Sequence, residues 1–156
     1  MDIKIRTATL KDLKTIQQLN GELFDYEIEN KFDYYIKDWA TSKDSEEYSS
    51  DLIENQFVII AETGNSPIAY LAGSVYNDNS LSYYEGLTAE LNNMFVKEEY
   101  RKFGIGTKLV NSFLDWCKQN NAKRVFVTAS AGNENTIKFY KNNGFYNINT
   151  TLRIDL

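Results

Sequence analysis

The chain has 156 residues, 42% of them hydrophobic and 14% aromatic, and a net charge of −5. A chain of this length and composition is neither disordered nor fibrous, and we expect a single domain over residues 1–156. It contains no histidine and one cysteine, which excludes an internal disulfide, nucleophiles activated by histidine and most zinc sites. We therefore expect no bound metal and a reducing, cytoplasmic environment.

No apolar run approaches the length that a membrane-spanning helix needs, and residues 57–61 are among the longest runs. The first residues alternate between apolar and polar side chains and lack the apolar stretch of a signal peptide. We expect no membrane partner and no nucleic-acid partner, and we leave a homodimer open.

Charge is divided along the chain. Residues 22–54 contain eleven acidic and three basic side chains, whereas residues 97–156 contain ten basic and five acidic ones. Most of these charges are expected to lie on solvated helix faces. The division nevertheless favours a cation site in the first part of the chain and an anion site in the second.

The first half of the chain is predicted to contain a strand, a long helix, a shorter helix and then two more strands. Residues 3–7 alternate with the period of a strand, and residues 10–26 have the apolar spacing of an amphipathic helix that follows a capping box. Residues 30–55 are the least regular part and end in a shorter helix. Two apolar runs at 57–62 and 68–76 predict a β-hairpin.

The second half continues the alternation of strands and helices. A polar loop at 77–86 precedes a strand at 87–96, and a basic turn at 101–106 precedes a helix whose apolar side includes Cys117. Residues 124–129 predict a strand, 134–143 a helix that ends at Gly144, and 145–156 a final strand. The order of elements predicts an α/β (α+β) domain with a mixed sheet.

The turn at 101–106 joins a strand directly to a helix and carries Gly104 and Gly106. The first N–H groups of a helix have no intrahelical acceptor and carry about half a positive charge, so such a turn can bind a phosphate or diphosphate. The spacing fits neither GxxxxGK(S/T) nor GxGxxG. It fits R/Q-x-x-G-x-G/A throughout, although an ordinary connecting turn would also contain glycines.

A second pattern follows at residues 133–145. These residues match N-x-x-(A/S/T)-x-x-x-Y-x-x-x-G-F, with Asn133, Thr136, Tyr140 and Gly144 at fixed positions. The two patterns in this order resemble the signatures of the N-acetyltransferase superfamily known as GNAT. The resemblance follows the element order of the whole chain and is sharpest over residues 87–145.

This resemblance implies a mixed, mostly antiparallel, twisted sheet of six to seven strands flanked by about four helices. The strands at 87–96 and 124–129 are expected to diverge like a V, and acetyl-CoA is the implied co-substrate, lying between them. The implied cofactor-binding residues are Met94, Phe95, Val96, Arg101, Lys102, Phe103, Gly104, Ile105, Gly106, Thr107, Asn133 and Tyr140.

The resemblance also implies direct acyl transfer in a ternary complex, without a covalent enzyme intermediate. Tyr140 is the implied catalytic acid toward the leaving thiolate, and a backbone N–H near Phe95 or Val96 the implied oxyanion donor. Glu90, eleven residues before Arg101, is the implied catalytic base by position. Whether Glu90 acts directly, through water or only in substrate binding stays open. Cys117 lacks an activating histidine, and we expect it to be a packing residue.

The acceptor is expected to be a primary amine. The acidic segment 22–54 corresponds to the roof of the acceptor side and favours a cationic acceptor: a polyamine, an aminoglycoside, or a lysine or N-terminal amine of a peptide. Solubility alone would also explain this acidity. The expected substrate-binding residues are Tyr34, Tyr35, Tyr83, Tyr84, Glu85 and Glu90.

The sequence therefore predicts an acyl-CoA-dependent N-acetyltransferase. Two alternatives stay open: a catalytically silent module that binds acyl-CoA as a sensor or interaction domain, and an enzyme that uses a longer acyl donor or runs another CoA-dependent reaction.

Overall fold

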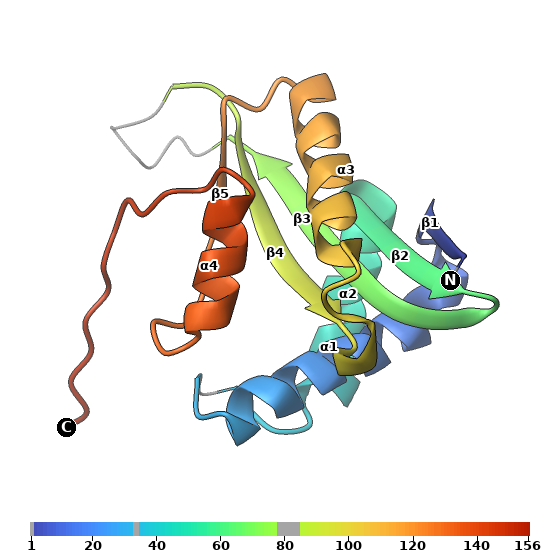
Figure 1. Cartoon of the computed structure of the whole chain (residues 1–156), viewed down its shortest axis with the longest axis horizontal. Helices are drawn as coiled ribbons and strands as arrows, with labels where there is room; N and C mark the ends of the chain where they lie inside the picture. The colour runs from blue at the N-terminus through green and yellow to red at the C-terminus, as the bar shows by residue number, and fades with distance from the viewer. Residues whose placement is uncertain (1, 33–34, 78–84) are drawn as a thin grey trace.

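A five-stranded mixed sheet forms the centre of the protein in the computed structural model, which describes residues 2–32, 35–77 and 85–156. The strands lie in the order β1 to β5, the first four antiparallel to their neighbours and β5 parallel to β4 (Figure 1). The strands are β1 (Ile3–Thr7), β2 (Phe57–Thr63), β3 (Ser66–Tyr76), β4 (Thr88–Val96) and β5 (Arg124–Val127). This sheet confirms the predicted α/β architecture.

In the part of the chain that the structure describes, four helices cover the two faces of the sheet. One face packs against α1 and α2, and the other against α3 and α4 (Figure 1). The helices are α1 (Leu13–Glu29), α2 (Lys43–Asn55), α3 (Ile105–Gln119) and α4 (Glu134–Asn142), with short 3₁₀ turns η1 (Leu10–Asp12), η2 (Trp39–Thr41) and η3 (Glu98–Tyr100). Of the described helices, none is long and apolar enough to cross a membrane.

The central strands are apolar on both faces because each face has its own core. Ile59 and Ile60 are consecutive in β2 and belong to opposite cores, as strand alternation requires. Cys117 lies in the core between α3 and the sheet and is only 2% exposed. This burial confirms the prediction that Cys117 is a packing residue.

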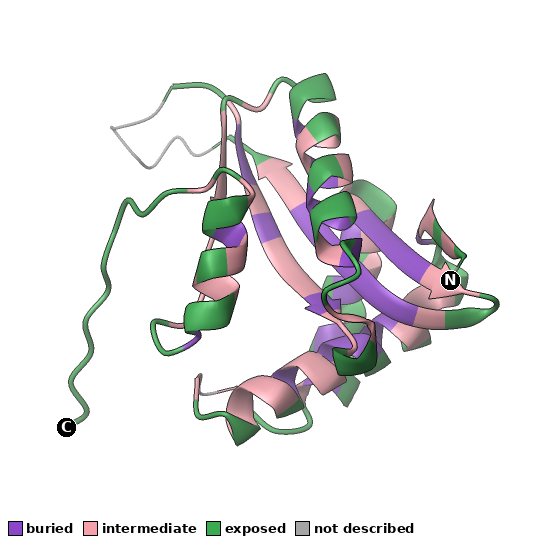
Figure 2. Ribbon diagram, in the orientation of Figure 1, coloured by how far each residue is buried: buried purple, intermediate pink, exposed green. Residues whose placement is uncertain are grey.

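The prediction of a final strand at 145–156 is wrong. The segment has no regular secondary structure, and every residue from 146 to 156 is exposed, including Leu152 at 90% and Ile154 at 82% (Figure 2). Alternating side chains favour an extended backbone, but a strand also needs a neighbour for its N–H and C=O groups. No strand of the described chain pairs with this segment, so the sheet has five strands instead of six to seven.

Candidate active site

The strands β4 and β5 diverge as predicted. They pair only between Thr88–Leu91 and Arg124–Val127. Beyond this point β5 ends, while β4 continues to Val96 along β3. The backbone of residues 92–96 therefore has β3 on one side and no strand of the described chain on the other. Such an edge can pair with the amide groups of an extended ligand.

A basic turn closes the open end of this V. Between η3 and α3, Lys102 and Gly104 both have left-handed backbones, with φ of 67° and 77°. Left-handed residues at such a turn orient successive N–H groups toward one concave side. Gly104 is also the N-cap of α3 and supplies no side-chain cap, so the first N–H groups of the helix stay available to an anion.

Glycine is required at the two positions of the turn for different structural reasons. A Cβ at Gly104 would meet no atom within 4 Å, so the positive φ alone explains the glycine there. A Cβ at Gly106 would lie 3.1 Å from Cζ of Phe139, which is too close for an undisturbed contact. Gly106 therefore allows α4 to pack against the first turn of α3.

The side chain of Arg101 turns back toward the protein. Its Nε donates a hydrogen bond to the Val96 carbonyl oxygen at 2.9 Å, and its guanidinium lies 4.5 Å from the centre of the Tyr26 ring. These contacts fix the turn against the end of β4 and the last turns of α1. The side chains of Lys102, Phe103 and Thr107, in contrast, are exposed beside the turn.

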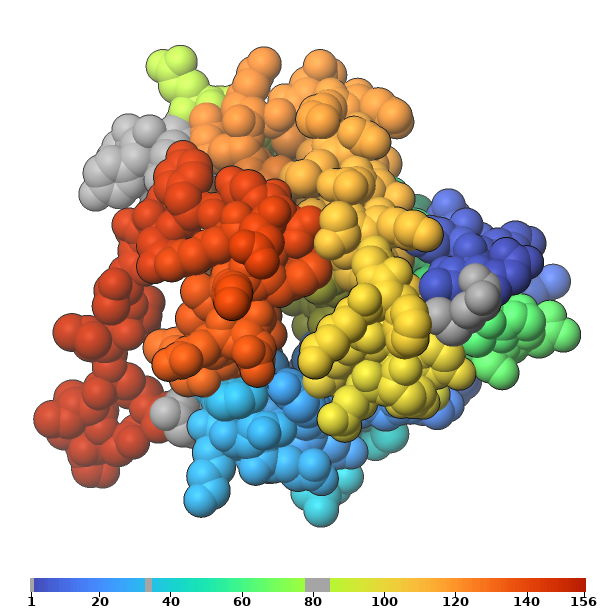
Figure 3. Space-filling view, in the orientation of Figure 1, coloured from blue at the N-terminus to red at the C-terminus, as the bar shows by residue number. Residues whose placement is uncertain are grey.

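The end of α1 reaches both arms of the V. Tyr26 lies under Arg101 on one arm, and the next residue, Glu27, accepts a hydrogen bond from Asn133 Nδ2 on the other at 3.1 Å. Figure 3 shows a hollow bounded by this end of α1 (blue), the segment around 97–104 (yellow) and α4 (orange-red).

Asn133 is engaged within the protein at both ends of its amide. It is 2% exposed, its Oδ1 accepts the Thr136 N–H at 3.2 Å as the N-cap of α4, and its Nδ2 donates to Glu27. Helix capping thus accounts for asparagine at this position. Its predicted contact with the cofactor stays a prediction.

Tyr140 lies on α4 and is 7% exposed, packed edge-on against Phe145. Burial, and then the negative charge of Glu27, raise the pKa of the Tyr140 phenol above its ordinary value. The phenol therefore stays protonated at neutral and mildly alkaline pH. A protonated phenol can donate a hydrogen bond or a proton to a developing thiolate.

A β-bulge arranges polar side chains on the α1/α2 face of β4. The register between β3 and β4 shifts between Ala72 and Gly73, which leaves Asn92 as the extra residue of β4. Glu90 is the cross-strand partner of Ser74, and Ser74 Oγ donates to Asn92 Oδ1 at 2.9 Å. Directly opposed residues share a face of the sheet, so the bulge brings Asn92 to the face that carries Glu90.

The helix α2 contributes a residue that sequence reasoning missed. Tyr48 donates from its hydroxyl to Asn93 Oδ1 at 3.5 Å. Burial, and then the charge of Glu90, raise the pKa of Tyr48. Its position beside β4 depends on how α2 packs, and no local pattern in the sequence shows this packing.

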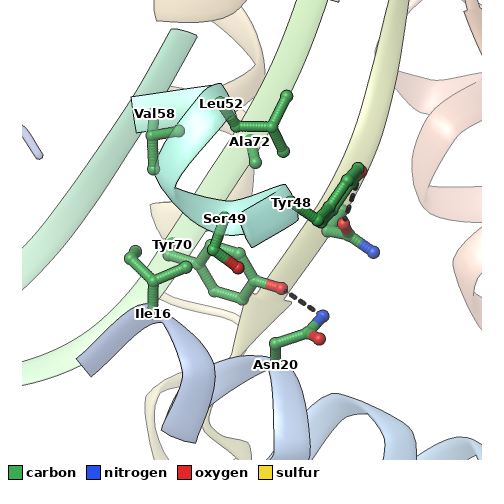
Figure 4. A pocket seen from close by; sticks show the side chains of 9 residues that line it. Ile16, Asn20, Tyr48, Ser49, Leu52, Val58, Tyr70 and Ala72 are labelled. Carbon is green, nitrogen blue, oxygen red and sulfur yellow. Dashed lines mark hydrogen bonds between the residues drawn. The ribbon is translucent and has the colours of Figure 1, made fainter. Parts of the chain in front are cut away.

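A small cavity lies behind Tyr48 (Figure 4). Its volume is about 10 Å³, and its polar lining residues are Asn20, Tyr48, Ser49, Tyr70 and Asn93. Asn20 Nδ2 donates to the Tyr70 hydroxyl at 2.8 Å, which anchors α1 on the centre of β3. The cavity has room for about one water molecule, so it is no substrate pocket by itself.

The structure describes two of the other residues predicted to line the acceptor site, and their role stays a prediction. Tyr35 stacks on Phe24 of α1 with ring centres 3.9 Å apart. Glu85 is exposed before the start of β4, at the opposite end of that strand from Asn93. Tyr34, Tyr83 and Tyr84 lie outside the described residues.

Comparisons with known proteins agree with this geometry. The family described as "Acetyltransferase (GNAT) family" matches residues 17–145. An uncharacterised N-acetyltransferase of Methanocaldococcus jannaschii is 28% identical over 141 residues, which cover 90% of this chain and 59% of that protein. The chain thus spans less than two thirds of the length of this relative.

Two solved structures share the fold. A predicted acetyltransferase from Clostridium acetobutylicum, solved with acetyl-CoA, has a TM-score of 0.78 at 20% identity and covers 99% of this chain and 96% of its own. An aminoglycoside 6'-N-acetyltransferase from Acinetobacter baumannii has a TM-score of 0.77 at 20% identity, covering 99% and 98%. With its V-shaped sheet, its basic turn before α3 and the family match over residues 17–145, the chain belongs to the acetyltransferase (GNAT) family.

Proposed function

We propose that this protein transfers an acetyl group from acetyl-CoA directly to a primary amine, with both substrates bound at once. The observation that carries the proposal is that β4 diverges from β5 and then leads to a turn before α3. This turn contains two residues with left-handed backbones. Membership in the family supports the reaction class.

The main chain supplies most of the cofactor site in this proposal. The N–H groups of residues 102–107 bind the diphosphate, while Lys102 adds positive charge and Arg101 holds the turn in place. The open edge of β4 at Met94, Phe95 and Val96 pairs with the amides of the pantetheine arm. Acetyl-CoA, when bound, supplies the activated acetyl thioester.

Tyr140 acts as the catalytic acid. In the reaction a carbon–nitrogen bond forms between acetyl group and amine, and the carbon–sulfur bond of the thioester breaks. Tyr140 gives its proton to the departing sulfur and is reprotonated from solvent. The raised pKa of its phenol keeps that proton in place until the sulfur develops charge.

Glu90 acts on the amine, and a backbone N–H that follows the bulge in β4 acts on the carbonyl oxygen of the thioester. Glu90 lies on the α1/α2 face, next to the open edge, and takes the proton that the amine loses, directly or through water. A backbone N–H at Phe95 or Val96 donates to the carbonyl oxygen as it becomes negative. Holding both reactants in this geometry contributes up to about 7–11 kcal/mol.

A cationic acceptor fits the charges around this site. Both α1 and α2 are rich in acidic side chains, and their face of the sheet carries Glu90. Such a surface raises the local concentration of cations. An aminoglycoside acetyltransferase has the same fold, which supports a polyamine or aminoglycoside as the acceptor. The amine of a lysine or of a peptide N-terminus is the alternative acceptor.

The test is thiol release from acetyl-CoA with spermidine, 1,4-diaminobutane, kanamycin A and Nα-acetyl-lysine methyl ester as acceptors. We expect release of CoA to depend on at least one of these amines and to yield the acetylated amine in equal amount. Tight binding of acetyl-CoA without amine-dependent release would show the catalytically silent module instead.

A further inference from the structure

Side chains from three elements form a polar cluster beside the open edge of β4. Glu90 and Asn93 come from β4, Tyr48 from α2, and Ser74 with Asn92 complete it on the sheet side. We call these five residues the bulge cluster. Its members lie on the α1/α2 face of the sheet, whereas α4, which carries Tyr140, packs on the other face. An acceptor at the cluster would thus approach the V from the side opposite Tyr140.

The cluster presents three groups whose oxygen atoms can accept hydrogen bonds. These are the carboxylate of Glu90, Oδ1 of Asn93 and the hydroxyl oxygen of Tyr48. The contact between Tyr48 and Asn93 is long, at 3.5 Å, and lies at the limit of a hydrogen bond. A group that donates to both oxygens would therefore displace only a weak interaction.

An aromatic row fixes Tyr48 from behind. Its ring packs edge-on against Trp39 at 5.9 Å, Trp39 stacks on Phe24 at 5.6 Å, and Phe24 stacks on Tyr35. Ring contacts of this kind limit side-chain rotation. The row thus holds the Tyr48 hydroxyl at one place above β4, which is the requirement for a residue that selects a substrate.

We propose that Glu90, Asn93 and Tyr48 bind the reacting amino group of the acceptor, and that Tyr48 makes the site specific for primary amines. The inference rests on the proposed acetyl transfer and names the residues that receive the amine. A primary ammonium has three N–H donors, one for each of the three acceptor groups. One proton passes to Glu90, and rotation about the C–N bond then turns the lone pair of the neutral amine from Glu90 toward the thioester carbon, while the two remaining N–H groups donate to Asn93 and Tyr48. A second proton leaves the nitrogen to solvent as the amide forms and the carbon–sulfur bond breaks. A secondary amine lacks one of these donors.

The test compares Tyr48→Phe with the unchanged protein on the fastest amine of the acceptor panel and on its N-methylated derivative. We expect the KM for the primary amine to rise about tenfold, because one hydrogen bond to a polar ligand is lost. The KM for acetyl-CoA should stay within about twofold. The preference for the primary over the N-methylated amine should fall. Asn93→Ala should raise the same KM.

Tyr146→Phe is the matched control, because it removes the same hydroxyl from a residue that is 81% exposed in the C-terminal segment. It should change neither KM. An unchanged amine KM in a normally folded Tyr48→Phe protein overturns the inference, and so does a loss in kcat alone. Absence of turnover with every amine in the unchanged protein would instead contradict the proposed function.

Discussion

Tyr140 and Cys117 are both buried with raised pKa values, yet the proposed function gives them different chemistry. Tyr140 lies on α4 with Glu27 as its charged neighbour. Cys117 is surrounded by the core between α3 and the sheet, and burial raises the pKa of its thiol to about 12. A raised pKa preserves a proton donor in the first case and prevents formation of a nucleophilic thiolate in the second.

Replacement of Tyr140 by phenylalanine should lower kcat about 100-fold, because a positioned acid contributes roughly 10²–10⁴-fold. Affinity for CoA, measured by calorimetry, should stay within about twofold, since the ring and its packing are kept. Because the pKa of Tyr140 is raised, the unchanged enzyme should not lose kcat on the alkaline side up to about pH 10. A Tyr140→Phe enzyme with full kcat would refute the assigned role.

Cys117 should resist alkylation in the folded protein. At about pH 8 a free thiol is partly ionised, but a buried thiol with a pKa of about 12 is almost entirely protonated. We expect mass spectrometry to find little modification by iodoacetamide in the native state and complete modification in guanidinium chloride. Native-state modification as fast as that of the unfolded chain would show that the thiol is accessible.

At the scale of elements, the proposed cofactor site depends most on the strand–turn–helix unit around residues 94–109. The turn keeps its shape because Lys102 and Gly104 adopt left-handed backbones and Arg101 binds the end of β4. A change in the backbone of this turn should therefore alter anion binding more than it alters stability.

Gly104→Ala tests this expectation, with Gly64→Ala as its matched control. Both glycines have positive φ, 77° and 58°, and at both a Cβ would meet no atom within 4 Å. Each substitution should cost about 1–2 kcal/mol in unfolding free energy from backbone strain alone. Only Gly104→Ala should weaken CoA binding, which calorimetry measures. Equal CoA affinity in the two variants would argue against the turn as the anion site.

Features that depend only on neighbouring residues are predicted more accurately from the sequence than features that depend on distant residues. The turn at 101–106 and the helix before Gly144 depend on neighbouring residues, and both are observed, although the helix ends at Asn142, one residue before its predicted end. The strand expected at 145–156 needed a distant partner, which no pattern within that segment specifies. Tyr48 and Asn93 meet because α2 packs over a bulge, and neither the packing nor the bulge was apparent from the sequence.

At the scale of the whole molecule, one ion cluster ties the start of the chain to the sheet. Arg6 of β1 binds both carboxylate oxygens of Asp12, at 2.9 and 2.7 Å, and Glu62 of β2 at 2.6 Å. The hydrogen bonds with Arg6 contribute most to lowering the pKa of Asp12 to about 2. The cluster thus joins two strands to the beginning of the first helical segment.

Asp12→Asn should destabilise the protein at neutral pH and matter less in acid. The carboxylate has a pKa of about 2 in the folded chain and about 3.9 when unfolded. Its stabilisation is therefore complete above about pH 5 and is lost as pH falls toward 2. Urea unfolding at pH 7 should show that the substitution lowers the free energy of unfolding by about 1–3 kcal/mol. At about pH 3 the difference between the two proteins should be smaller. A gap independent of pH would contradict the ionic role of Asp12.

In the proposed function the two substrates are separated by charge and by face of the sheet. The acidic helices α1 and α2 cover the side with Glu90, and the basic turn before α3 lies at the end of the V. A crystal structure of the protein with CoA tests this arrangement most directly. We predict the diphosphate on the N–H groups of residues 102–107 and the pantetheine arm along residues 94–96. A diphosphate bound elsewhere, with this turn closed to it, would contradict the proposed site.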